Sequence, residues 1–282
     1  MNILVAGLGK GSWEMRGQQL GAAIGARVTS TPTAADWQWA QVAILVKRAA
    51  FHLAAPARQA GVPIIWDALD FWSQPRENWM SAHAAHQLLG ATIAEIRPAL
   101  TICATEAMAR ACDGAYLPHH SWAGLEPQPA REQMGVVAYE GNPAYLGRWH
   151  DELSRACRSR GWSFVVNPAD IRTVDLFVAF RDGQWDGYPC REWKSGVKVS
   201  NAIAAGRPII GQTSAALREM APPHTIVESP TELDAALDAW TPHAARAAAV
   251  DVCRLKAPAL RLSAIVAQYR DVLQQVEASC AA

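Results

Sequence analysis

The chain has 282 residues, of which 50% are hydrophobic and 18% charged, which excludes a disordered protein and allows one large core or two modest ones. Its 26 basic and 26 acidic residues give a formal net charge of zero. This balance excludes a global attraction to nucleic acid or to an anionic membrane, but it permits a local basic groove.

The start of the chain and its cysteines indicate a soluble protein of the cytoplasm. Residues 2–7 form one short apolar run with no basic segment before it, so we expect a strand and not a secretion signal. No run approaches the ~18 apolar residues that a membrane span needs. The six cysteines are scattered without a metal-binding spacing, which is typical of reduced thiols and predicts no metal site.

The first strand, residues 2–7, leads into a glycine-rich loop and a helix over about residues 13–25. A dinucleotide-binding fingerprint has glycines at its first, third and sixth positions, but the sixth position here is Ser12. The acidic residue that should end the second strand, near residues 26–30, is also missing. The loop with Gly11 and Ser12 therefore fits a nicotinamide cofactor poorly, and the alternative is a tight strand-to-helix turn.

Two aspartates follow the fourth predicted strand. We expect strands over residues 41–46 and 62–66, with a helix over about residues 51–60 between them. Asp67 and Asp70 come directly after the second of these strands, and ligands of parallel sheets gather at the carboxyl ends of the strands. Both are candidate general bases, because a base must lie within hydrogen-bonding reach of the reacting hydroxyl. The alternative is that they cap a turn or a helix.

A boundary between two domains is predicted at the proline-rich residues 125–133, which are typical of a linker. The adjacent His119 and His120 lack a third metal ligand at a suitable spacing, so we interpret them as loop residues. In the rest of the first half we expect a helix over about residues 82–97, strands over residues 100–104 and 115–117, and between these strands a second helix that Thr105 can cap.

The second half continues the alternation of strands and helices that is typical of an α/β protein. We expect strands over residues 135–139, 163–166, 175–180 and 225–227, and helices over about residues 145–160, 242–256 and 258–278. Ser229 and Glu232 form a capping box, with Pro230 at the first helical position, so a helix begins there.

Residues 193–211 carry the clearest binding signal of the chain. Lys194 and Lys198 lie at the start of a helix that ends at Gly206, where a glycine can take the left-handed C-cap conformation. Cations are disfavoured at a helix start, so their presence calls for a compensating anion, and backbone N–H groups at a helix start suit a phosphate. The alternative is a plain core helix with solvated lysines.

Residues 198–209 read KVSNAIAAGRPI, which resembles the donor-binding helix of GT-B glycosyltransferases. These enzymes carry a similar K-x-x-N/E-A-x-A-x-G-x-P-hydrophobic signature. Many of them have one glutamate at the position of Asn201 and another at the position of Trp193, so the paired-carboxylate version of the motif is absent here.

The resemblance implies an α/β fold in which two Rossmann-like domains face a central cleft and a C-terminal helix crosses back to the first domain. Residues 1–124 would form the acceptor domain, residues 134–257 the nucleotide-sugar donor domain, and residues 258–282 the returning helix.

The resemblance also implies the residues of a donor site. Lys194, Ser195 and Lys198, with the backbone of residues 195–198, would hold the diphosphate, and Asn167 would lie beside the base. The glycine-rich loop would let the donor or the acceptor approach the backbone, and a surface ion pair is the alternative for the arginine among the candidates. The full set is Gly11, Ser12, Glu140, Gly141, Asn167, Arg181, Lys194, Ser195, Lys198 and Asn201.

The implied reaction moves a sugar from a nucleotide diphosphate sugar, with UDP the expected nucleotide, to an acceptor hydroxyl. Basic side chains and a helix start would stabilise the leaving phosphate without a metal, and no other cofactor is expected. Lys198 is the predicted catalytic cation, and Asp67 or Asp70 the predicted base.

The small members of this family include enzymes that glycosylate modified pyrimidines in viral DNA, so the resemblance favours a hydroxylated or hydroxymethylated pyrimidine in DNA as the acceptor. The basic loop residues Lys10, Lys47, Arg48 and Arg76 would suit such a partner. The alternatives are a small molecule, a lipid-linked sugar or a protein as acceptor, and a non-catalytic nucleotide-binding protein with a degenerate GT-B fold. We expect a monomer or a weak dimer.

Overall fold

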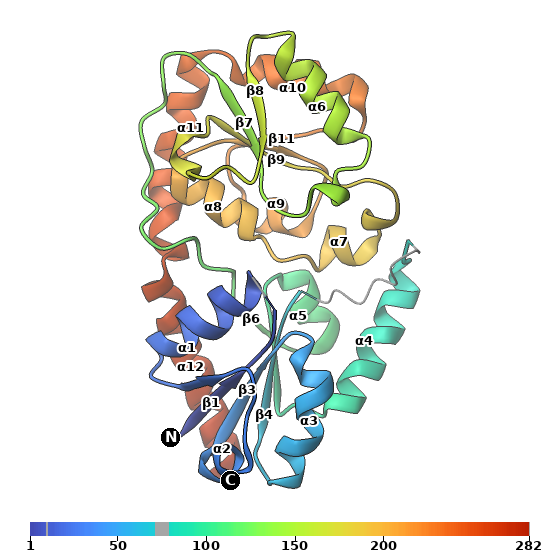
Figure 1. Cartoon of the computed structure of the whole chain (residues 1–282), viewed down its shortest axis with the longest axis vertical. Coiled ribbons are helices and arrows are strands. Elements are labelled where there is room, and N and C mark those ends of the chain that lie inside the picture. The colour runs from blue at the N-terminus through green and yellow to red at the C-terminus, as the bar shows by residue number, and fades with distance from the viewer. Residues whose placement is uncertain (10, 71–78, 282) are drawn as a thin grey trace.

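The computed structural model describes residues 1–9, 11–70 and 79–281. Figure 1 shows two α/β lobes, one above the other, that are joined by a linker and by the last helix of the chain. Each lobe is built on one parallel sheet. We call the lobe that begins the chain the N-lobe and the other the C-lobe. The prediction of two Rossmann-like units is therefore confirmed.

The N-lobe sheet has the strand order β2-β1-β3-β4-β5-β6. Its strands β1, β3 and β4 are buried along their whole length, as expected for parallel strands that helices cover on both faces. The strands are β1 (Ile3–Ala6), β2 (Arg27–Thr29), β3 (Val42–Val46), β4 (Ile64–Leu69), β5 (Leu100–Cys103) and β6 (Ala115–Tyr116). The helices are η1 (Trp13–Gln19), α1 (Leu20–Ala23), α2 (Ala34–Trp39), α3 (Ala49–Gln59), α4 (Ala82–Ile96) and α5 (Glu106–Cys112).

The C-lobe sheet has the strand order β11-β10-β9-β7-β8. Its strands are β7 (Val136–Tyr139), β8 (Ser163–Val166), β9 (Leu176–Ala179), β10 (Ile209–Gly211) and β11 (His224–Ile226). The α-helices around it are α6 (Trp149–Arg158), α7 (Tyr188–Glu192), α8 (Val197–Ala205), α9 (Ala215–Met220), α10 (Leu233–Trp240) and α11 (His243–Lys256). The short helices are η2 (Pro143–Tyr145), η3 (Ile171–Thr173), η4 (Gly183–Trp185), η5 (Pro230–Glu232) and η6 (Ala257–Leu260).

The first helix differs from the prediction, because its first part, η1, is a π-helix. The indole of Trp13 is buried between two glycines. A Cβ atom on Gly17 would lie 1.9 Å from Cε3 of this ring, and one on Gly7 would lie 2.3 Å from the same atom. The wider turn and the missing side chains together make room for the indole.

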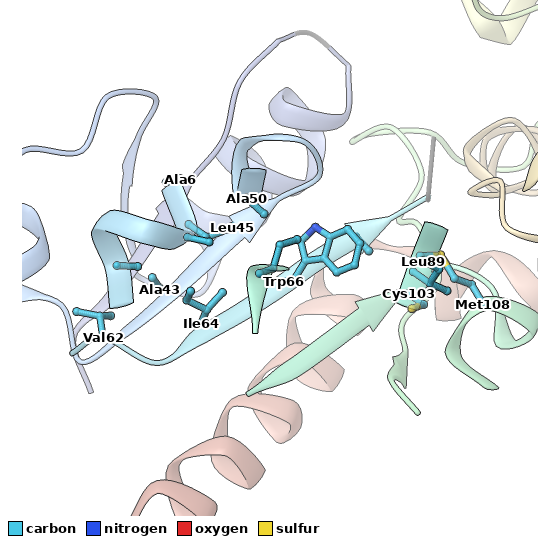
Figure 2. Packing of buried hydrophobic residues seen from close by; sticks show 14 of the residues in the cluster. Ala6, Ala43, Leu45, Ala50, Val62, Ile64, Trp66, Leu89, Cys103 and Met108 are labelled. Carbon is cyan, nitrogen blue, oxygen red and sulfur yellow. The ribbon is translucent and has the colours of Figure 1, made fainter. Parts of the chain in front are cut away.

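One core of the N-lobe is organised around Trp66 on β4. Figure 2 shows its indole between Leu45 of β3 on one side and Leu89 and Met108, from α4 and α5, on the other. The indole Nε1 donates a hydrogen bond to the carbonyl oxygen of Lys47 at 3.0 Å. Trp66 therefore fixes the backbone that follows β3.

The last helix, α12 (Leu262–Ala281), returns to the N-lobe as predicted. Its residues Ile265, Tyr269 and Leu273 belong to one buried cluster with β1 and β3. Among the described residues, no helix has the length and the apolar content to span a membrane.

Asp67 of β4 lies beneath α12 with no exposed surface. Its Oδ2 is 3.3 Å from Nε of Arg16 and accepts a hydrogen bond from the Tyr269 hydroxyl at 3.2 Å. Burial raises the pKa of this carboxyl, while Arg16 and Tyr269 act in the opposite direction. Since the carboxylate connects η1, β4 and α12, its environment is that of a structural group and does not support the catalytic role expected from the sequence.

The linker between the lobes is attached along its length to the C-lobe. Gln128 donates its backbone N–H to the carbonyl of Ala205 at the end of α8, at 3.2 Å. The guanidinium of Arg207 donates to the carbonyls of Gln128 and Pro129, both at 3.0 Å. A Cβ atom on Gly206 would lie 3.0 Å from Pro127, so glycine permits this close approach.

Asp67→Asn should lower the free energy of unfolding by about 3–5 kcal/mol, because it leaves the Arg16 guanidinium buried without a counter-charge. Urea denaturation at pH 7.5 measures this loss. Tyr269→Phe is the matched control, since it removes one hydrogen bond to the carboxylate and should cost about 1.5–3 kcal/mol. A larger loss in the tyrosine variant than in the aspartate variant would contradict this ranking.

The free energy of unfolding should also decrease as the pH is lowered, because His119 and His120 are buried just before the linker. Burial, helped by the charge of Arg16, lowers the pKa of His120 from 6.5 to about 4 and that of His119 well below its usual range. Below pH 6.5 the unfolded chain binds these protons more readily than the folded chain. The free energy of unfolding should thus decrease by up to about 1.4 kcal/mol per pH unit for each histidine.

Urea denaturation at a series of pH values between 7.5 and 4.5 measures this dependence. His120→Asn should remove one of the two contributions and so make the dependence about half as steep, because the variant keeps a polar side chain near Gln19, the partner of His120 Nε2, and cannot titrate, while His119 still does. An equally steep loss of stability in the variant would show that other groups cause it.

Candidate functional site

A cavity of about 210 Å³ lies at the carboxyl ends of β9 and β10 in the C-lobe. Three segments form most of its wall: the loop after β7, the residues that follow β9, and the start of α8. Its lining includes Glu140, Gly141, Tyr145, Arg181, Lys194, Ser195, Gly196, Lys198, Gln212 and Ser214. Six of the predicted site residues lie in this wall. Two more, Asn167 and Asn201, do not line the cavity but are hydrogen-bonded to Gly141 and Glu140, which do.

The start of α8 presents its backbone to this cavity. Gly196 is the N-cap residue, and no side chain caps the helix among the described residues. A Cβ atom on Gly196 would lie 2.6 Å from the sulfur of Met220 and 3.1 Å from Cβ of Ala216, so the helix start packs closely against α9. The free N–H groups of a helix start, together with the helix dipole, favour an anion.

Cationic side chains surround the same space. The ammonium of Lys198 lies 4.0 Å from the centre of the Tyr139 ring, and the guanidinium of Arg181 lies 5.4 Å from the centre of the Tyr145 ring. Burial, with the charges of Arg181 and Lys194, holds the pKa of Lys198 well below its usual range, although Glu140 opposes this. Burying positive charge costs free energy, and an anion bound beside these cations would offset that cost.

Glu140 and Asn201 form a pair at one end of the cavity. The side-chain amide of Asn201 donates to Oε1 and Oε2 of Glu140, each at 3.2 Å, and its Oδ1 accepts from the backbone N–H of Trp122 at 3.0 Å. Burial raises the pKa of Glu140, while Asn201 and Lys198 lower it. A carboxylate from the loop after β7 thus lies directly beside the side chain at position 201.

A second cavity of about 570 Å³ shares Glu140 with the first. Besides Glu140, its wall consists of residues 122–125, where the linker begins, and residues 167–172 after β8. Asn167 adopts the left-handed conformation, with φ at 52°, and its side chain accepts from the N–H of Gly141 at 2.7 Å and donates to its carbonyl at 3.0 Å. Asn167 thus shapes the loop of Glu140 as well as lining this cavity.

The remaining predicted residues lie elsewhere. Asp67, Asp70, Gly11 and Ser12 line neither of the two cavities. Asp70 lies at the interface of the lobes, where its Oδ1 is 2.7 Å from Nζ of Lys47 and its Oδ2 is 2.5 Å from Nζ of Lys194. The two ammonium groups lower the pKa of Asp70 despite its burial, and a carboxylate held in this way is a weak base.

Gln212, which was not among the predicted site residues, holds the backbone of Arg181 in place. Gln212 accepts a hydrogen bond from the backbone N–H of Arg181 at 2.8 Å and donates to Asp186 at 3.3 Å. Asp186 also pairs with Arg191 at 2.7 Å, and Asp182 pairs with Arg148 at 3.3 Å. The position of Gln212 directly after β10 was the available signal.

Among the described residues, no group of three or more histidine, cysteine, aspartate or glutamate side chains could hold a metal ion.

Lys198→Met should raise the free energy of unfolding of the empty protein by about 1 kcal/mol, because it replaces a buried ammonium with an apolar side chain of similar length. Thermal unfolding without ligand measures the gain. Lys256→Met is the control: its ammonium donates to the carbonyl of Met220 outside the site, and no gain is expected from its loss. A less stable Lys198 variant would contradict the cost assigned to this cation.

Neither a protein-family model nor a curated protein matches the chain, but solved structures do. HepE from Anabaena, in complex with UDP, has a TM-score of 0.61 at 12% identity, over 98% of this chain and 100% of HepE. A UDP-forming trehalose-phosphate synthase from Burkholderia vietnamiensis has a TM-score of 0.62 at 10% identity, over 96% of this chain and 84% of the synthase. The lipopolysaccharide outer core galactosyltransferase WaaB has a TM-score of 0.57 at 11% identity, over 98% of this chain and 99% of WaaB. At these identities the likeness carries the fold alone, and the chain has the GT-B fold of glycosyltransferases.

Proposed function

We propose that the protein transfers a sugar from a nucleotide diphosphate sugar to an acceptor hydroxyl. The observation that carries this proposal is the meeting of Lys194, Lys198 and Arg181 with the uncapped start of α8 around one cavity. In this proposal residues 1–124 form the acceptor domain and residues 134–257 the donor domain.

The two cavities together suit an elongated donor. The diphosphate would occupy the cationic cavity, and the nucleoside would extend past Glu140 into the cavity beside Asn167 and Pro168. A carboxylate between the two is a hydrogen-bond acceptor for the hydroxyl groups of a ribose or a sugar. The UDP in the HepE structure supports uridine as the first base to test.

The cationic cavity fits the electrostatic demand of the reaction. When the bond from the sugar to the diphosphate breaks, negative charge grows on the leaving phosphate oxygen. Fixed positive groups in a buried site stabilise that charge more than they stabilise the intact donor. Lys198 is the proposed catalytic cation, because its ammonium is buried beside the start of α8. The side chains supply this charge themselves, so we propose a metal-independent transfer.

For the acceptor we propose DNA that carries a hydroxymethylated pyrimidine, with a small molecule, a lipid-linked sugar or a protein as alternatives. Among the basic residues that favoured DNA, Lys47 is engaged by Asp70, while Lys10 and Arg76 lie outside the described residues. A direct assay with modified and unmodified duplexes therefore decides this part of the proposal.

A thermal-shift panel of UDP- and GDP-sugars, with and without duplex DNA that bears hydroxymethylated pyrimidines, tests donor and acceptor together. A donor present at a hundredfold excess over its dissociation constant stabilises the folded chain by about 2.7 kcal/mol. Slow release of free nucleotide from the donor that binds would identify an enzyme. Binding without any release, with or without acceptor, would favour a non-catalytic nucleotide-binding protein.

Lys198→Ala should lower turnover at least about a hundredfold, which corresponds to the 2.7–4 kcal/mol of barrier assigned to one oxyanion donor. Nucleotide release is measured at saturating donor, and circular dichroism verifies that the variant is folded. Turnover close to that of the unmodified protein would remove Lys198 from the mechanism.

A further inference from the structure

The carboxylate of Asp70 is shared between the two lobes. It follows β4 in the N-lobe, is almost completely buried, and is bonded by Lys47 of its own lobe and by Lys194 of the C-lobe. The hydroxyl of Ser195 lies 3.4 Å from the same Oδ2 atom. Both Lys194 and Ser195 also line the cationic cavity. One ammonium group therefore faces an N-lobe carboxylate on one side and the candidate donor site on the other.

We propose that Asp70 is a positioning residue that acts through Lys194 and keeps the affinity of the donor site for a diphosphate low. This inference rests on the proposed function. A diphosphate that enters the cavity must compete with Asp70 for the ammonium of Lys194, so Asp70 weakens binding of both the donor and the nucleotide product.

The charges around Lys194 support the claim that Asp70 lowers the affinity for a diphosphate. Lys47, Arg181 and Lys198 are the cations that face this region. Asp70 is the carboxylate bonded to Lys194, and Glu140 offsets part of the charge of Lys198 on the other side of the cavity. In a buried site such charges are screened weakly, so removal of one negative charge raises the positive potential at the cavity. Burial lowers the pKa of Lys194 to about 8, and Asp70 opposes that shift, which agrees with a strong mutual interaction.

Contacts that do not involve Lys194 also hold the two lobes together. Glu219 of α9 accepts hydrogen bonds from the backbone N–H groups of Glu106 and Ala107, at 2.8 and 3.0 Å, at the start of α5. Thr105 donates to the carbonyl of Glu192 at 3.0 Å, and the indole of Trp193 is buried in the N-lobe core. The exchange of Lys194 from Asp70 to a phosphate therefore does not require the lobes to separate.

The test is calorimetric titration of the full chain and of Asp70→Asn with UDP and with uridine. The variant should bind UDP about fivefold or more tightly, the lower end of coupling between neighbouring sites, and uridine with unchanged affinity. Asp70→Glu, which keeps the charge, should bind UDP as the unmodified chain does. In steady-state kinetics with the donor, Asp70→Asn should lower both KM and kcat, because the product UDP leaves more slowly.

Glu219→Gln is the matched control, because Glu219 is also a carboxylate at the lobe interface but does not line the cavity. Its UDP affinity should equal that of the unmodified chain. A folded Asp70→Asn variant that binds UDP equally or more weakly would overturn the inference, as would an equal gain for uridine.

Inorganic pyrophosphate separates this inference from the proposed function. If the unmodified chain binds pyrophosphate but neither UDP nor GDP, the proposed nucleotide-sugar function is wrong, and the comparison of pyrophosphate affinities between Asp70→Asn and the unmodified chain still decides the inference. If neither form binds any of the three anions, both are wrong.

Discussion

The concentration of positive charge where the two lobes meet is the constraint on which the rest of the site depends. Lys194, Lys198 and Arg181 lie around one cavity, and burial depresses the pKa values of both lysines. Two carboxylates moderate this charge, Asp70 from the N-lobe and Glu140 from the loop after β7. Buried cations of this kind contribute little to the stability of an empty protein. A polyanion bound between the three cations would offset the cost of their burial, which is the physical reason for the proposed function.

The contact between the lobes explains one departure from the GT-B pattern. The position where many of these enzymes carry the first glutamate of their pair is occupied by Trp193, whose side chain is completely buried in a cluster of N-lobe residues. Its ring packs edge-on against Tyr188 and His86, with centroid distances of 5.3 and 4.9 Å. The residue thus joins α7 to α4, and a charged side chain could not fill the same space without a buried partner. The lobes are therefore connected along a second line, on the far side of the site from the linker.

The sequence predicted the features that depend on local patterns. The alternation of strands and helices predicted both parallel sheets, and the small residues around Gly206 predicted α8 and its left-handed end, where φ is 74°. Features that join distant segments could not be read in the same way. Asp67 was expected at a reaction centre, but its partner Tyr269 lies 202 positions away, and nothing local to either residue indicates the pair. The sharing of Lys194 between Asp70 and the cavity has the same origin, since Asp70 follows a strand of one sheet and Lys194 lies in the lobe of the other.

The crossing of α12 has a consequence for how the molecule is made. The apolar face of this helix completes a core that β1 and β3 begin, and Tyr269 covers the ion pair of Arg16 and Asp67. A ribosome therefore releases the strands of the N-lobe well before the segment that seals them. During synthesis all six described strands of the N-lobe emerge before the C-lobe, but the apolar surface that α12 covers stays exposed, or shielded by a chaperone, until the end of the chain is made. The N-lobe is therefore translated before the C-lobe but cannot complete its core until after it.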